Sequence, residues 1–144
     1  MEPLSVGVHA VYQVGNFRTS QSIAVFGCGP VGLLCMAVAK ASGASRIIGI
    51  DVNSARLDFA KTYAATDVYL PPNVEQGEGN PEYSRRNAAR MKAELCIEDT
   101  GPHSIDLVID ASGAELSIQT AFYIAKSGGT FVQVRCSQAT SMIA

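Results

Sequence analysis

Residues 22–51 read SIAVFGCGPVGLLCMAVAKASGASRIIGID, and this stretch decides the fold. Residues 23–26 form a short apolar run that ends at a glycine, and residues 33–41 follow as a helix rich in small residues. Residues 46–50 predict a second buried strand, and Asp51 stands at its end. A strand, a glycine-rich turn, a helix and a second strand with a terminal acid are typical of a dinucleotide-binding unit.

The glycine motif Gly27-x-Gly29-x-x-Gly32 lies between the first strand and the helix. Gly27 permits the tight turn, Gly29 lets the backbone approach a pyrophosphate, and Gly32 lets the helix pack against the sheet. Pro30 suits the first helical turn, whose free N–H groups and positive dipole end favour an anion. Asp51 is predicted to accept hydrogen bonds from the adenosine ribose. The alternative is a glycine-rich turn that binds no ligand.

Composition limits the partners that this chain is expected to have. Its 144 residues fit one domain, and its net charge of −2 gives no support for nucleic-acid or membrane-surface binding. The longest apolar run, residues 31–39, is too short to span a bilayer, and the N-terminus does not resemble a signal peptide. The four cysteines lack zinc-ligand spacing and are expected to be reduced. We therefore expect a cytoplasmic protein with no nucleic-acid partner and no membrane partner.

The rest of the chain alternates between helical and strand patterns. The predicted elements are helix 4–14, helix 54–64, strand 67–70, helix 82–97, strand 105–110, helix 115–126 and strand 130–134, with Gly128 and Gly129 as the last turn. This alternation predicts an α/β, Rossmann-type doubly wound parallel sheet of order 3-2-1-4-5. The ligand crevice should lie at the carboxyl ends of strands one and four. A basic stripe on helix 82–97 is expected to be a solvated face, with phosphate binding as the alternative; its members are Arg85, Arg86, Arg90 and Lys92.

Several motifs carry a family resemblance in one register. They are EPLSVGVHA at 2–10, VFGCGPVGLLC at 25–35, Arg56-Leu57, DASGAE at 110–115 and SGGTFVQV at 127–134. Together they resemble the cofactor-binding domain of the medium-chain, zinc-dependent dehydrogenases, in the sorbitol and xylitol (polyol) dehydrogenase branch. The resemblance divides the chain into a lead-in helix at 1–21, an NAD-binding domain at 22–134 and an unassigned tail at 135–144.

The resemblance also implies contacts with NAD. Matched positions on the pyrophosphate and adenosine are Val31, Asp51 and Arg56; those on the adenosine-side turn are Ser112 and Gly113; Val134 offers a backbone contact near the nicotinamide. Arg56 could instead be a solvated helix residue, and Ser112 and Gly113 could form only a turn. Glu2 matches a glutamate that faces the catalytic zinc and its water or substrate.

The implied function is NAD(H) binding within a polyol dehydrogenase, which moves a hydride from a secondary alcohol to NAD. The family holds its zinc through an N-terminal domain with no counterpart in this sequence, so we expect zinc only in full-length relatives. A polyol substrate is expected only if such a catalytic domain is supplied. Residues 135–144 do not align, so the family's sixth strand is expected to be missing or altered. The exposed edge of strand 130–134 could then pair with another copy. The alternative is a non-catalytic NAD-binding module or a truncated remnant without activity.

Overall fold

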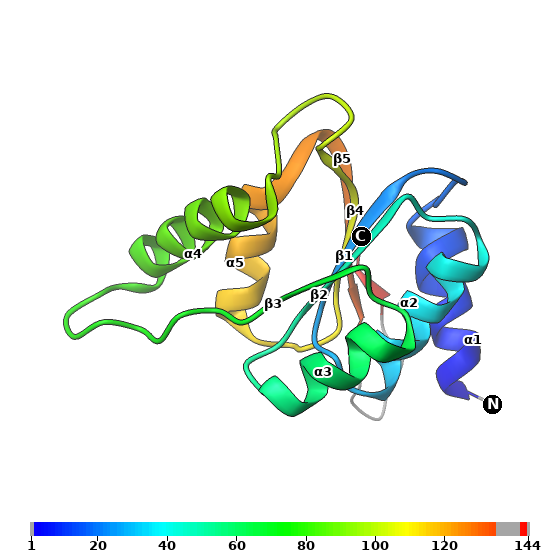
Figure 1. Ribbon diagram of the computed structural model, residues 1–144, viewed down its shortest axis with the longest axis horizontal. Helices are drawn as coiled ribbons and strands as arrows, with labels where there is room; N and C mark the ends of the chain where they lie inside the picture. The colour runs from blue at the N-terminus through cyan, green and yellow to red at the C-terminus, as the bar shows by residue number, and fades with distance from the viewer. Residues whose placement is uncertain (1, 135–141, 144) are drawn as a thin grey trace.

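A computed structural model describes residues 2–134 and 142–143, and it shows one twisted sheet with helices on both faces (Figure 1). The elements in chain order are α1 (Glu2–Val8), η1 (His9–Val14), β1 (Ser22–Phe26), α2 (Pro30–Ala41), β2 (Arg46–Ile50), α3 (Ser54–Tyr63), β3 (Asp67–Tyr69), α4 (Asn80–Leu95), β4 (Ile105–Asp110), α5 (Glu115–Ile124), β5 (Ala125–Val134) and β6 (Met142–Ile143). The strand order is β3-β2-β1-β4-β5-β6. The first five strands are parallel, which confirms the predicted doubly wound sheet and its order.

Two hydrophobic layers hold the helices on the sheet. Successive side chains of a strand point to opposite faces, so Val25 belongs to one layer and Phe26 to the other. The layer that contains Val25 packs against η1, α2 and α3, and the layer that contains Phe26 packs against α4 and α5. All five residues of β1 are buried, as expected for a central parallel strand covered on both faces. This central position places the turn after β1 in the middle of one sheet edge.

The N-terminal helix is irregular in a way that its sequence pattern does not reveal. The predicted helix 4–14 is an α-helix only through Val8, and η1 continues it as a π-helix. Ala10 and Val11 of this segment are fully buried against the sheet layer that contains α2. The 3.6-residue period identified the helical segment, and the wider last turns are a feature of its packing.

The junction between α5 and β5 differs from the prediction. We expected helix 115–126 and a turn at Gly128 and Gly129, but α5 ends at Ile124 and β5 already begins at Ala125. Ile105 pairs with Ala125 and Leu107 pairs with Thr130, so the glycines lie inside an irregular stretch of β5. Lys126 pairs with the Asp106 carboxylate of β4, and this contact holds the start of β5 alongside its neighbour.

The sixth strand is altered, as the sequence predicted. Met142 pairs with Val134 and Ile143 with Gln133, in the antiparallel direction. This two-residue strand, β6, lies in residues 135–144, which the sequence analysis left unassigned. No helix of the described part of the chain combines the length and the apolar character that a membrane crossing requires.

Candidate cofactor-binding site

A cavity of about 330 Å³ opens where the carboxyl ends of several parallel strands meet. Its wall is built from the segments that follow β1, β2, β3 and β4, and from the first turn of α5. The lining residues are Gly27, Gly29, Ile50, Asp51, Val52, Arg56, Pro71, Ala111, Ser112, Ala114 and Ser117. In open parallel sheets, ligands bind at this edge, beside the strand at which the order of connections reverses.

The three positions of the glycine motif differ in whether, and why, the fold requires glycine. Gly27 has a φ of +100°, which a residue with a Cβ adopts only with strain. A Cβ on Gly32 would stand 1.8 Å from the Gly27 carbonyl oxygen, so the fold itself requires glycine there. A Cβ on Gly29 would meet no atom within 4 Å. Folding therefore does not demand glycine at Gly29, and the open space beside it in the cavity fits a ligand group such as a pyrophosphate.

Asp51 connects the glycine loop to the end of β2. Its Oδ2 accepts a hydrogen bond from the Cys28 N–H at 2.8 Å, and its Oδ1 accepts one from the Asn53 N–H at 2.9 Å. The Arg56 Nη1 lies 3.9 Å from Oδ2. Each carboxylate oxygen can accept a further hydrogen bond, so capacity for ribose hydroxyls remains. The structure thus adds to Asp51 a second task, the anchoring of the glycine loop, which the sequence did not reveal.

The Cys28 thiol, which lies near this carboxylate, is unreactive at neutral pH. Burial, and then the neighbouring Asp51 charge, raise the pKa of Cys28 to about 12. Because the thiolate is the nucleophile and the metal ligand, Cys28 stays protonated and unreactive at neutral pH. Its position in the glycine loop is therefore structural.

The opposite wall is a turn organised by a buried acid. Asp110 Oδ1 accepts hydrogen bonds from the Ser112 N–H at 3.1 Å and the Ser112 hydroxyl at 2.6 Å. The Ser112 hydroxyl oxygen in turn accepts from the Ala114 N–H at 3.2 Å, and Gly113 has a φ of +73°. Asp110 is fully buried, and its Oδ2 has no hydrogen-bond partner among the described residues. Burial raises the pKa of Asp110.

Half of the ten predicted cofactor-contact residues line this cavity. Five of them line it: Gly27, Gly29, Asp51, Arg56 and Ser112. Gly113 lies between two lining residues, while Pro30, Val31 and Gly32 form the first turn of α2 beside the cavity without lining it. Val134 is buried in the core, and its backbone pairs with β6. Glu2 lies in α1, and its side chain is outside the described part of the structure.

Sequence reasoning missed several residues of the wall. Val52, Pro71 and Ser117 were not proposed, although all three line the cavity. The first two follow directly or closely on a predicted strand end, so their position beyond β2 and β3 was a usable signal. The basic stripe of α4 contributes nothing to the wall. Its members pair within the molecule instead: Arg85 with Tyr123, Arg86 with Glu78, Arg90 with Glu94 and Lys92 with Asp99.

Zinc does not fit this part of the chain. Within residues 2–134 and 142–143, no three side chains of His, Cys, Asp or Glu lie together as a set that could hold a metal ion. A zinc site with fewer than three protein ligands would be unlike the known catalytic sites. The described residues therefore offer no ligand set for a metal.

Comparison with known proteins gives a consistent family. The zinc-binding dehydrogenase family matches residues 30–142. The probable D-xylulose reductase A of Aspergillus terreus and the D-xylulose reductase A of Aspergillus niger are each 50% identical over 133 residues, 92% of this chain. That match covers 34% of either relative, so the chain spans about a third of the length of the curated relatives it matches.

Solved structures agree with this assignment. The alcohol dehydrogenase TADH from Thermus sp. ATN1 superposes with a TM-score of 0.69 at 30% identity, over 97% of this chain and 35% of that one. Galactitol-1-phosphate dehydrogenase from Escherichia coli superposes with a TM-score of 0.72 over 99% of this chain and 36% of that one; at 22% identity this second likeness shows the fold alone. The chain therefore belongs to the zinc-binding dehydrogenase family.

Proposed function

We propose that this chain binds NAD(H) in the cavity beside Gly29 and supplies the cofactor-binding part of a polyol dehydrogenase. The single observation that carries the proposal is the open space at Gly29 in a cavity that Asp51 also lines. A glycine that the fold does not require, next to an acid at the end of the second strand, is the arrangement that a dinucleotide needs. The identity of the relatives as D-xylulose reductases supports a polyol as the substrate class.

Each part of the site has a task toward the cofactor. The N–H groups at the start of α2, together with the helix dipole, attract the pyrophosphate, and no acidic side chain stands in the first turn of α2 to oppose it. Asp51 orients the adenosine ribose, and Arg56 and Ser112 border the same half of the cavity. Bound NAD supplies the hydride acceptor for oxidation of a secondary alcohol. The residues of this chain bind and orient that acceptor.

The test is a fluorescence titration with NADH of the wild type and of Gly29→Val. Valine at this position meets no protein atom near its Cβ and has a permitted φ of −79°, so the variant should fold, with a loss of stability of about 1 kcal/mol from the less favourable helix N-cap. It should nevertheless lose binding by at least about tenfold, since a tightly approached phosphate is displaced and each lost charged hydrogen bond is worth about 1.5–3 kcal/mol. Equal NADH affinity in a folded Gly29→Val protein would contradict the proposal.

A second function from another class is kept as the alternative. A non-catalytic module, or a truncated remnant without activity, would have the same fold. An assay of NADH formation from NAD and xylitol distinguishes an active dehydrogenase from a non-catalytic module, because a module that only binds NAD gives no turnover. We expect the 144-residue chain alone to give binding without turnover, and measurable NADH formation that is lost in Asp51→Asn would favour a complete enzyme.

Two further parts of the proposal concern self-association and cellular location. We propose that β5 supports self-association, because β6 pairs with only two of its ten residues. Unpaired strand edges favour pairing with another copy. A cytoplasmic location is also proposed, since reduced thiols and a soluble nicotinamide cofactor suit that compartment.

A further inference from the structure

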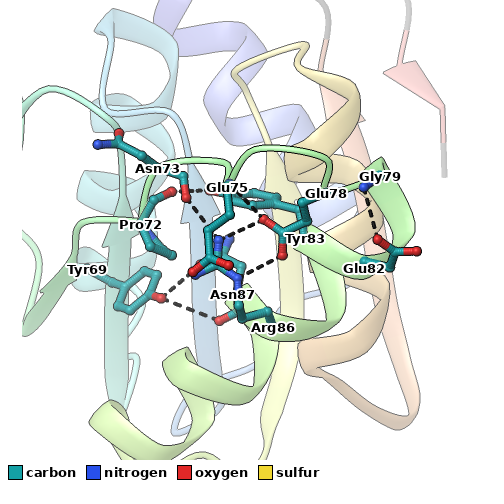
Figure 2. A network of polar contacts seen from close by, with 10 residues as sticks. All are labelled: Tyr69, Pro72, Asn73, Glu75, Glu78, Gly79, Glu82, Tyr83, Arg86 and Asn87. Carbon is teal, nitrogen blue, oxygen red and sulfur yellow. Dashed lines mark hydrogen bonds and ion pairs between the residues drawn. The ribbon is translucent and has the colours of Figure 1, made fainter.

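Pro71, in the segment after β3, lines the cavity. Side chains of α4 bind this segment before and after Pro71, and Figure 2 shows the contacts at Tyr69 and Pro72. Before Pro71, the Tyr69 hydroxyl donates to Asn87 Oδ1 of α4 at 2.8 Å. After it, the Pro72 carbonyl accepts from the Tyr83 hydroxyl of α4 at 2.6 Å. Tyr69, Tyr83 and Asn87 are all at least 95% buried, so the Tyr69–Asn87 contact is shielded from water and the Tyr83–Pro72 contact is partly shielded.

Arg86 lies one turn after Tyr83 on α4, and its guanidinium binds the same loop. Its Nε and Nη2 each donate to one Glu78 oxygen at 2.8 Å, and Nη2 also donates to the Asn73 carbonyl at 2.9 Å (Figure 2). The Glu75 carboxylate lies 3.9 Å from Nη1. Hydrogen bonding from Arg86 lowers the pKa of Glu78 to about 2, so the pair remains ionised across the neutral range. The planar fork of arginine matches this bidentate geometry, and an ammonium does not.

The same helix also holds the far wall of the cavity. The Ser84 hydroxyl donates to Gln119 Oε1 of α5 at 3.1 Å, and Asn87 Nδ2 donates to the Thr120 hydroxyl at 3.4 Å. Ser117 of α5 lines the cavity less than one turn before these two residues. Helix α4 therefore connects the Pro71 wall with the α5 wall without itself lining the cavity.

We propose that Tyr83 and Arg86 of α4 are positioning residues for the adenosine half of the cofactor, an inference that rests on the proposed NAD(H) binding. Pro71 shares the cavity with Asp51 and Val52, which stand at the end of β2 where the adenosine ribose is expected. Because Tyr83 and Arg86 fix the loop in advance, less conformational freedom is lost when the ligand binds. Neither residue needs to contact the cofactor for this effect.

The experiment measures the Kd of ADP-ribose and of NADH for Tyr83→Phe, Arg86→Lys and a control. Tyr83→Phe removes only the hydroxyl bonded to Pro72, and Arg86→Lys keeps the charge but loses the fork. Arg85→Lys is the matched control, since Arg85 is the neighbour on the same helix and contacts Tyr123 of α5 rather than the loop. All titrations are run at a temperature at which circular dichroism shows each variant fully folded.

We expect both Tyr83→Phe and Arg86→Lys to raise the Kd of ADP-ribose and NADH about fivefold, from one lost hydrogen bond and the added ordering of the loop. The control should bind as the wild type does. A merely structural role would lower the melting temperature and speed hydrogen exchange at residues 70–79 without changing either Kd of the folded protein, and that result would overturn the inference. If the wild type binds NADH while all three variants bind equally well, only this inference fails. If the wild type binds neither ligand, the proposed function fails as well.

Discussion

At the scale of single residues, we expect Asp51 to decide which dinucleotide the site accepts. Its side chain is 7% exposed and already receives hydrogen bonds from Cys28 and Asn53. A 2′-phosphate would remove a ribose hydroxyl donor, a loss of about 1.5–3 kcal/mol. It would also place negative charge near the carboxylate, with a repulsion of up to roughly 4 kcal/mol at 4 Å and an effective dielectric of 20.

We therefore expect the wild type to bind NADH at least about tenfold more tightly than NADPH. Asp51→Asn should reduce this preference to less than about threefold, because the repulsion disappears while one oxygen remains for the loop. Parallel fluorescence titrations with both reduced cofactors measure the ratio. Equal affinities of the wild type for NADH and NADPH would contradict this role of Asp51.

Asp110 makes the stability of the fold depend on pH. Burial raises its pKa in the folded state above the ordinary value of 3.8, so the folded state holds the Asp110 proton more tightly than the unfolded state does. The stability that this proton contributes is fully present below the unfolded pKa and is lost as the pH rises through the folded pKa. Asparagine cannot ionise, and it keeps an oxygen for the two Ser112 hydrogen bonds.

Urea unfolding of the wild type and Asp110→Asn between pH 4 and 7 measures this effect. The free energy of unfolding of Asp110→Asn, taken relative to the wild type, should increase as the pH rises. Other titrating groups are common to both proteins and cancel in the difference. A difference that stays constant across the range would show that Asp110 has an ordinary pKa in the fold.

At the scale of elements, the sequence predicted the bounds of an element best where the hydrophobic pattern and the flanking turn residues indicate the same limits. The bounds of β2 and β4 match the apolar runs 46–50 and 105–110 residue for residue, because both strands are buried on both faces. The apolar run placed the helix at 33–41, three residues after the observed start of α2, although Pro30 had been recognised as suited to the first helical turn, where α2 does begin. The α5–β5 junction was misplaced because Gly128-Gly129 is a strong turn signal, and the long-range Asp106–Lys126 pair that overrides it is invisible locally.

The candidate site was predictable to a similar degree. The glycine motif and Asp51 were found because their spacing along the chain reflects one local unit. Pro71 follows a predicted strand end and could have been proposed, whereas no local pattern shows that Ser117 in the first turn of α5 borders the cavity. The loop anchor formed by Asp51 and the Cys28 N–H also joins two segments 23 residues apart, which no local pattern encodes.

The edge of β5 is the element from which we predict self-association. Among the described residues, β6 covers Gln133 and Val134 and no other strand pairs with that side of β5. Sedimentation velocity should show a dimer or larger species that increases with protein concentration. Thr130→Lys should shift the protein toward the monomer, since charged side chains on an edge strand disfavour pairing. A wild type that stays monomeric at high concentration would contradict this prediction.

At the scale of the whole molecule, the sheet acts as a frame that brings distant segments to one edge. The cavity collects the ends of β1, β2 and β4 and the loop after β3, and helices on both faces hold these strands in register. The chain matches 34% of the length of its curated relatives, and within this part the described residues line the cavity proposed for the dinucleotide and hold no set of side chains that could bind a metal ion. The central claim is therefore the location of cofactor binding.

Amide chemical-shift mapping by NMR tests that claim most directly, in a chain of 15.2 kDa. On addition of NADH, the largest shifts should occur at residues 27–33, 51–53 and 111–114, with smaller shifts near Pro71. The exposed face of α5 around Phe122 and the start of β5 should not respond. Saturable shifts that are largest in those three segments are the result that the structure predicts. Shifts centred elsewhere on the fold, or none at millimolar NADH, would contradict it.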